Sequence, residues 1–182
     1  EPTAVSKFLI ALGYAAYSEN EFDEAQRHLT EAVTLSDTSQ TQHQKYLAIG
    51  NLGMVFLARG ERAKARKYLT EAVEHLDTLG DAANVADFTS AMGQLELSAD
   101  HQQKALDHLK KGLKTAKTAN AQGEMLGAVA GYAALFESLA KPEAESLYSY
   151  ILEHPSSLPM QRKEAKERAS SGANDFAGWD LV

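Results

Sequence analysis

The sequence predicts an all-α protein: a right-handed solenoid of about four antiparallel helix pairs followed by a C-terminal capping helix. Three observations predict this fold class. The segment Leu29–Val33 recurs unchanged as Leu69–Val73, forty residues later. Apolar residues within each unit are spaced three and four apart, as on one face of an amphipathic helix. Proline is rare, with 4 residues, whereas the helix-favouring residues Ala, Leu, Glu and Lys are frequent.

The repeating units are expected near residues 6–40, 46–80, 86–120 and 125–153. Equivalent positions lie forty residues apart in three series, which are Gly13, Gly53 and Gly93, then Ala25, Ala65 and Ala105, then Leu29, Leu69 and Leu109. Three matched series indicate that the units share one structure. The fourth unit keeps the apolar pattern but lacks one residue in its turn, so its signal is weaker.

Turn residues divide each unit into two helices. Gly80 followed by Asp81 indicates a helix C-terminus and then an N-cap, and Pro142 suits the first position of a helix. We also expect Asp100 to cap a helix, with Gln103 three residues later. The predicted helices are residues 4–18, 21–36, 41–59, 61–79, 81–98, 101–118, 121–139 and 142–153.

The C-terminal part is expected to close the array. Residues 157–170 have one polar side and predict a capping helix, because a solenoid needs a terminal element with a polar outer face. Residues 1–170 would then form one domain. Residues 171–182 have turn composition and contain Trp179, the only tryptophan, so a flexible tail is expected there.

The glycine series needs a packing reason. A glycine inside a helix costs about 1 kcal/mol relative to alanine, so three glycines at one position require a compensating contact. Close approach of the second helix, at the alanine series, is the expected contact. A bulky residue at Ala65 should therefore destabilise the protein by overpacking.

Composition and charge exclude several classes of function. Lys and Arg number 18 against 25 Asp and Glu, a net charge of −7, which argues against direct binding to nucleic acid or an anionic membrane. The chain contains no Cys, so disulfides and thiolate zinc sites are excluded and a reducing compartment is favoured. No stretch is long and apolar enough for a membrane span. We expect a cytoplasmic protein.

Catalytic and metal-binding patterns are not found in the sequence. The 6 His show no His-x-x-x-His spacing of a helical zinc site. There is no Gly-x-Ser-x-Gly elbow and no glycine-rich phosphate loop after a strand. The acidic residues are spread along exposed helix faces with basic partners. We therefore expect no enzyme activity, no cofactor and no metal.

The repeat resembles the tetratricopeptide repeat. The resemblance lies in the pairs Leu12-Gly13, Leu52-Gly53 and Met92-Gly93 of the first helix, and in the Ala and Leu series of the second. The family repeat is usually about 34 residues, whereas the interval here is 40. The longer interval is similar to that of helical-repeat domains in bacterial transcriptional regulators. The last predicted helix, which follows His154-Pro155 at the end of the final repeat, is also similar to theirs.

The resemblance implies a concave groove lined by the first helix of each pair. Six groove residues are candidates for contact with a protein or peptide: Tyr14, Tyr17, Asn51, Met54, Asp87 and Gln94. The tyrosines and Met54 would offer adaptable apolar contact, and Asn51 with Gln94 would hold a peptide backbone. Alternatively, Tyr14 and Met54 pack between successive repeats. Asp87 would repel a carboxylate.

The function expected from these observations is a non-catalytic protein- or peptide-binding scaffold, as the interaction or sensor domain of a larger bacterial regulatory protein. Two alternatives stay open. One is a peptide-sensing allosteric switch, and the other is a dimerisation or spacer element, with a possible homodimer. Phe176 and Trp179 of the tail are further candidates, as self-inhibitory occupants of the groove.

Overall fold

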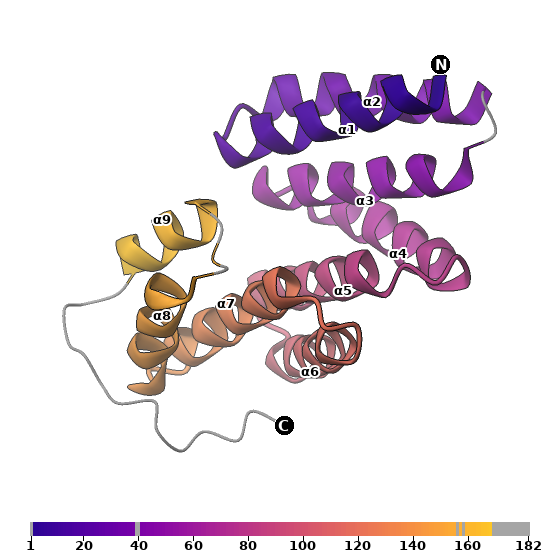
Figure 1. Ribbon diagram of the computed structural model, residues 1–182. Coiled ribbons are helices and arrows are strands. Elements are labelled where there is room, and N and C mark those ends of the chain that lie inside the picture. Colours follow the sequence, from indigo (N-terminus) through magenta and orange to yellow (C-terminus); the bar gives the residue numbers. More distant parts are fainter. Residues whose placement is uncertain (1, 39–40, 156, 158, 169–182) are drawn as a thin grey trace. The chain divides into compact units, whose positions relative to one another are not determined.

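The computed structural model describes residues 2–38, 41–155, 157 and 159–168. Every regular element in these ranges is an α-helix (Figure 1). Successive helices pack on one another in the order of the sequence within residues 2–78 and within residues 102–168. The predicted fold class, an all-α solenoid of helix pairs, is therefore confirmed.

The helices agree with the predicted ranges to within two residues at each end. They are α1 (Pro2–Ser18), α2 (Phe22–Thr38), α3 (Gln42–Ala58), α4 (Arg62–Thr78), α5 (Ala82–Ser98), α6 (Gln102–Thr118), α7 (Gln122–Ser138), α8 (Glu143–Glu153) and α9 (Pro159–Arg168). Each helix from α1 to α7 has 17 residues. The 40-residue repeat is therefore two 20-residue steps of similar geometry.

The turns that follow α1 and α3 to α7 share one hydrogen-bond pattern. After α3, Gly60 has φ of 74°, and the amides of Gly60 and Glu61 donate to the carbonyls of Leu57 and Phe56 at 2.9 and 2.8 Å. This is the Schellman arrangement, in which a left-handed residue ends the helix. Left-handed residues recur in the described turns at Asn20, Gly60, Gly80, Asp100, Asn120 and Ala140.

This pattern corrects the prediction for Asp100. With φ of 60°, Asp100 terminates α5, and a residue in that conformation does not adopt the extended geometry of an N-cap. His101 takes the N-cap position of α6 without a side-chain cap bond. Asp81 does cap α5 as expected, since its Oδ1 accepts the amide hydrogen of Asn84 at 3.2 Å.

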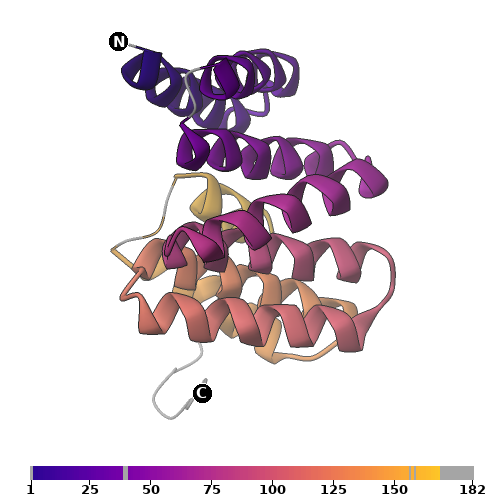
Figure 2. The ribbon, with the colours of Figure 1, turned by 90° about the vertical axis from the view of Figure 1, so that its right-hand side faces the viewer.

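Contacts divide the chain into two compact units, Glu1–Phe88 and Thr89–Val182, with the boundary inside α5. In the first unit α1 packs on α2, α2 on α3 and α3 on α4, and α1 also contacts α3. Figure 1 and Figure 2 both show α1 beside α2. In the second unit α7 contacts α6 and α8, and α9 packs on α7 and α8.

The glycine series lies where the two helices of a pair approach each other. A Cβ on Gly13 would lie 2.6 Å from Leu29 Cγ, and a Cβ on Gly53 would lie 2.8 Å from Leu69 Cγ. The leucine side chain, rather than an alanine methyl group, is thus the nearest neighbour. At Gly13 the carbonyl oxygen of Ala25 follows, at 3.4 Å. Only a residue without a side chain leaves room for this contact.

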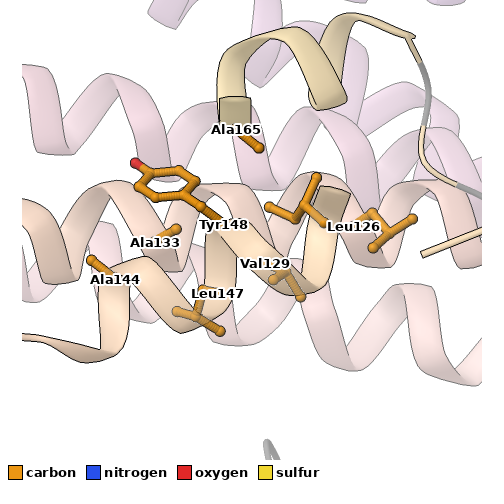
Figure 3. Close-up of a cluster of buried hydrophobic side chains, with 8 residues drawn as sticks. Leu126, Val129, Ala133, Ala144, Leu147, Tyr148 and Ala165 are labelled. Atoms are coloured by element: carbon orange, nitrogen blue, oxygen red, sulfur yellow. The ribbon is translucent and has the colours of Figure 1, made fainter. Parts of the chain in front are cut away.

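The core of the second unit joins three helices. Leu126, Val129 and Ala133 from α7 meet Ala144, Leu147, Tyr148 and Ile151 from α8. Ala165 of α9 is 1% exposed and lies over these side chains (Figure 3). α9 is the helix that falls in the region expected to cap the array. The predicted tail, residues 171–182, lies outside the described residues, and so do Phe176 and Trp179.

Candidate functional site

Three large side chains on α1 and α3, the first helices of the first two pairs, stay partly exposed. Tyr14 and Tyr17 of α1 are half-buried, and Ala16 beside them is 7% exposed. Forty residues later, Met54 on α3 is half-buried, and Phe56 is 5% exposed. Because α1 and α3 contact each other, these side chains belong to adjacent helices. We call Tyr14, Tyr17 and Met54 the first-helix face.

Aromatic rings gather at the α1 end of this face. The ring centroids of Tyr14 and Tyr17 are 6.3 Å apart, and those of Tyr17 and Phe22 are 6.1 Å apart. Both separations fall in the range of favourable tilted contacts. Phe22, at the start of α2, was not among the predicted site residues. Its position directly after the turn Asn20-Glu21 was the available signal.

Asn51 has little surface to offer a ligand. Its side chain is 8% exposed, and its Nδ2 donates a hydrogen bond to the carbonyl of Leu47 at 3.0 Å. The equivalent residue of α5, Ala91, is also buried, at 4% exposure. This position therefore faces the interior of the array in both helices.

The two remaining candidates lie in different units. Asp87 is half-buried in the first unit, and Gln94 is exposed in the second. Asp87 places a carboxylate near the end of the first unit. The first unit thus contains five of the six candidates, which are Tyr14, Tyr17, Asn51, Met54 and Asp87, and the second unit contains Gln94.

A hydrogen-bonded link fixes the start of α3 to the start of α5 within the first unit. Nε2 of His43 lies 2.7 Å from Oδ2 of Asp81, and Nδ2 of Asn84 donates to the same oxygen at 2.7 Å. Burial raises the pKa of Asp81, but the bonds from Asn84 and His43 outweigh it, so the pKa lies below its ordinary value of 3.8. This pairing of His43 with Asp81 was not predicted from the sequence, because the two residues lie 38 positions apart.

A second link joins the turn after α3 to α2. Nη1 of Arg59 donates to Oε1 of Gln26 at 2.7 Å, and the guanidinium forms an ion pair with Asp23. Asp23 is fully exposed, at 100% of its side chain, so the ion pair adds little free energy. The link connects the end of α3 to α2, the helix that packs on α1.

Three titratable side chains of the second unit contact one another beside a surface hollow. A hollow of about 330 Å³ is lined by residues that include Glu137, Tyr148 and Arg168. Oε2 of Glu137 accepts hydrogen bonds from the Tyr148 hydroxyl at 3.0 Å and from Arg168 Nη1 at 2.7 Å. Burial, then the bond to Glu137, raises the pKa of Tyr148 to about 12. These bonds attach α9 to α7 and α8.

Among the described residues, no group of three or more His, Asp or Glu side chains could hold a metal ion. None of the described helices combines the length and the apolar character that crossing a membrane requires.

Comparison with known proteins identifies the repeat. Residues 37–118 match the model of the tetratricopeptide repeat family. The chain is a tetratricopeptide-repeat-like protein. Tetratricopeptide repeats generally mediate protein–protein interactions, and their fold is typically a non-catalytic scaffold. A search of curated protein sequences finds no match.

A solved structure has a similar fold. The crystal structure of BtubC (BKLC) from P. vanneervenii is similar, with a TM-score of 0.64 and 16% sequence identity. The alignment covers 100% of this chain and 72% of that one. At this identity the similarity concerns the fold alone.

Proposed function

We propose that this tetratricopeptide-repeat-like chain is a non-catalytic scaffold that binds a peptide, or an extended segment of a partner protein, along the first-helix face. One observation carries the proposal: Tyr14, Tyr17 and Met54 are large side chains that stay half-buried on α1 and α3, two helices that contact each other. Large side chains held on rigid helices at the surface are typical of binding faces.

The side chains on this face favour a ligand with apolar anchors and no excess of negative charge. Tyrosine offers a large contact area with only two side-chain torsions to fix, and methionine adapts to irregular shapes. Asp87 is proposed as a polar contact within the first unit, where its carboxylate disfavours an acidic ligand. Gln94 belongs to the second unit and is proposed as a polar contact of that unit alone. Asn51, at 8% exposure, is proposed only for a contact at the edge of the face.

We further propose that the chain acts within a larger bacterial regulatory protein of the cytoplasm. The support is the 40-residue interval between equivalent residues such as Leu29 and Leu69, which is similar to that of helical-repeat regulators. A peptide-sensing switch and a dimerisation or spacer element are the alternatives. A switch predicts that peptide binding changes the exchange of helix amides far from the face, whereas a spacer predicts self-association without a ligand.

The test begins with selection of binding peptides from a random peptide library displayed on phage, followed by calorimetric titration of the best peptide. Tyr14→Ala and Met54→Ala should each weaken binding at least tenfold, which corresponds to about 1.4 kcal/mol. Tyr150→Ala is the matched control, because Tyr150 is a half-buried tyrosine that lies on α8, the second helix of the fourth pair, and not on the first-helix face. It should change the affinity less than twofold.

Circular dichroism of each variant separates loss of binding from loss of folding. If folded Tyr14→Ala and Met54→Ala bind the peptide as well as the original chain does, the first-helix face is not the binding site. If the control weakens binding as much as they do, the assignment to this face is also wrong.

A further inference from the structure

The exposed side of α6 concentrates positive charge. This helix carries five lysines and one acidic residue, Asp107, although the whole chain has a net charge of −7. Oδ1 of Asp107 accepts a hydrogen bond from Nε2 of Gln103 at 3.1 Å. The helical period places the lysines on one side of α6, opposite its buried residues. We call the five exposed lysines the lysine face, and they are Lys104, Lys110, Lys111, Lys114 and Lys117.

The repeat structure does not explain the lysines. α4 and α6 have the same length, 17 residues, and they bury equivalent positions at intervals of forty residues. The exposed positions of the two helices nevertheless carry opposite charges. Three positions that are acidic in α4, as Glu71, Glu74 and Asp77, are occupied in α6 by Lys111, Lys114 and Lys117. A helix of this fold therefore accepts acidic residues where α6 has lysines.

The lysine face is electrostatically unfavourable for the chain by itself. Lys114 lies four residues after Lys110 and three residues before Lys117, and like charges at these spacings destabilise a helix. Lys104 lies in the first turn of α6, where the helix dipole disfavours a cation. Among the described residues, none provides an ion-pair partner for any of the five lysines. An anionic ligand would relieve this repulsion.

The composition of α6 favours carboxylates of a peptide over nucleic acid or a membrane. α6 contains no Arg and no Phe, Tyr or Trp. Arginine suits bidentate contacts with phosphate, and aromatic side chains stack on unpaired bases. A helix that lies on a membrane inserts exposed apolar side chains, whereas α6 exposes no large apolar residue. The net charge of −7 also repels a long polyanion.

We propose that the lysine face binds an acidic peptide segment of a partner protein. Lys104 and Lys117 are thirteen residues apart, which is about 20 Å along the helix axis. An extended segment of about six residues spans this length. Residues 169–182, outside the described ranges, hold two acidic residues, Asp175 and Asp180, which is too few to pair with five lysines. The lysine face lies on α6 of the second unit, whereas the first-helix face belongs to the first unit.

The test is a titration of a fluorescent peptide with the full chain, followed by fluorescence anisotropy. The peptide has twelve residues in which Glu and Ser alternate, and the matched peptide has Gln in place of each Glu. The acidic peptide should bind at least tenfold more tightly than the Gln peptide at about 50 mM salt. Its affinity should fall as the salt concentration rises, because exposed charges are screened.

Neutral substitutions locate the binding face. A triple variant of α6 should bind the acidic peptide at least fivefold more weakly, and its changes are Lys111→Gln, Lys114→Gln and Lys117→Gln. A second variant gives α6 the acidic residues of α4 and should bind no better than the Gln peptide binds the original chain; its changes are Lys111→Glu, Lys114→Glu and Lys117→Asp. Circular dichroism confirms that both variants fold.

A control variant changes the net charge equally at a distance from α6. It neutralises three exposed lysines of α1, α4 and α9, with the changes Lys7→Gln, Lys67→Gln and Lys163→Gln. The affinity for the acidic peptide should change less than twofold, because charges far from the ligand are screened. A loss equal to that of the α6 triple variant would show that net charge alone attracts the peptide, and it overturns the proposal.

The other outcomes are equally decisive. Equal affinity for the Glu and Gln peptides overturns the proposal. Tighter binding of a single-stranded DNA of twelve nucleotides, or of phosphatidylglycerol vesicles, also overturns it, because phosphate is then the preferred ligand. The double variant Asp175→Asn and Asp180→Asn should change the peptide affinity less than fivefold, and a larger gain would identify residues 169–182 as the occupant instead.

The two binding proposals are separable. Tyr14→Ala should change the affinity for the acidic peptide less than twofold, while it weakens the peptide selected for the first-helix face. A larger loss would place the acidic peptide on the first-helix face and overturn the assignment to α6. Failure of either face leaves the measurement at the other unaffected.

Discussion

The left-handed turn residues allow an unusually direct test of what ends these helices. Ala140 has φ of 51°, and Gly60 has φ of 74° at the equivalent point of an earlier turn. A non-glycine residue in this conformation costs about 1–2 kcal/mol. We predict that Ala140→Gly stabilises the protein and that Gly60→Ala destabilises it.

The magnitude follows from two opposing effects. Ala140→Gly relieves the left-handed strain but increases the freedom of the unfolded chain, which costs about 0.5–1 kcal/mol. The net gain should be about 1 kcal/mol, or about 2–4 °C in Tm for a chain of this size. Gly60→Ala should lose a similar amount. No atom lies within 4 Å of a Cβ built on Gly60, so packing does not contribute.

The assay is thermal and urea denaturation followed by circular dichroism at 222 nm. Ala119→Gly is the matched control, because Ala119 is an exposed turn residue with φ of −80°. There glycine relieves no strain, and the variant should lose about 0.5–1 kcal/mol. If Ala140→Gly lowers the Tm as Ala119→Gly does, left-handed strain does not determine the stability of these turns.

Three further predictions follow from the packing, the cap and the buried tyrosine. Gly53→Ala should lower the free energy of unfolding by about 1–3 kcal/mol through overpacking. Gly123→Ala should be neutral or stabilising, because its Cβ would have no neighbour within 4 Å. Chemical denaturation measures both changes. Asp81→Ala should lower the free energy of unfolding by about 1 kcal/mol at pH 7. Because the folded-state pKa of Asp81 lies below 3.8, this contribution is lost as the pH falls through that pKa. The denaturation curves of Asp81→Ala and of the original chain should therefore converge in acid. Ultraviolet titration should show one tyrosine ionising near pH 12, and this step should be missing in Tyr148→Phe. Its presence in the variant would refute the assignment of this pKa to Tyr148.

The predicted groove residues differ in their exposure, and the reason is local. Tyr14 and Met54 follow from the 40-residue repeat, because their position on the helix sets their half-exposure. Asn51 occupies an equally regular position but is 8% exposed and bonded within its own helix. A single sequence does not show which side of a first helix a neighbouring pair covers.

The sequence by itself determined where each helix begins and ends. Apolar spacing, glycine positions and turn residues act over a few neighbours along the chain, so the expected helices and the observed ones differ by at most two residues. Tertiary structure decided which equivalent residues are covered. Phe8 is 64% exposed and Phe88 is 1% exposed, although they share one position in the repeat, because burial depends on the helix pair packed against a residue. The link between His43 and Asp81, which are 38 residues apart, likewise forms only when folding brings α3 and α5 together.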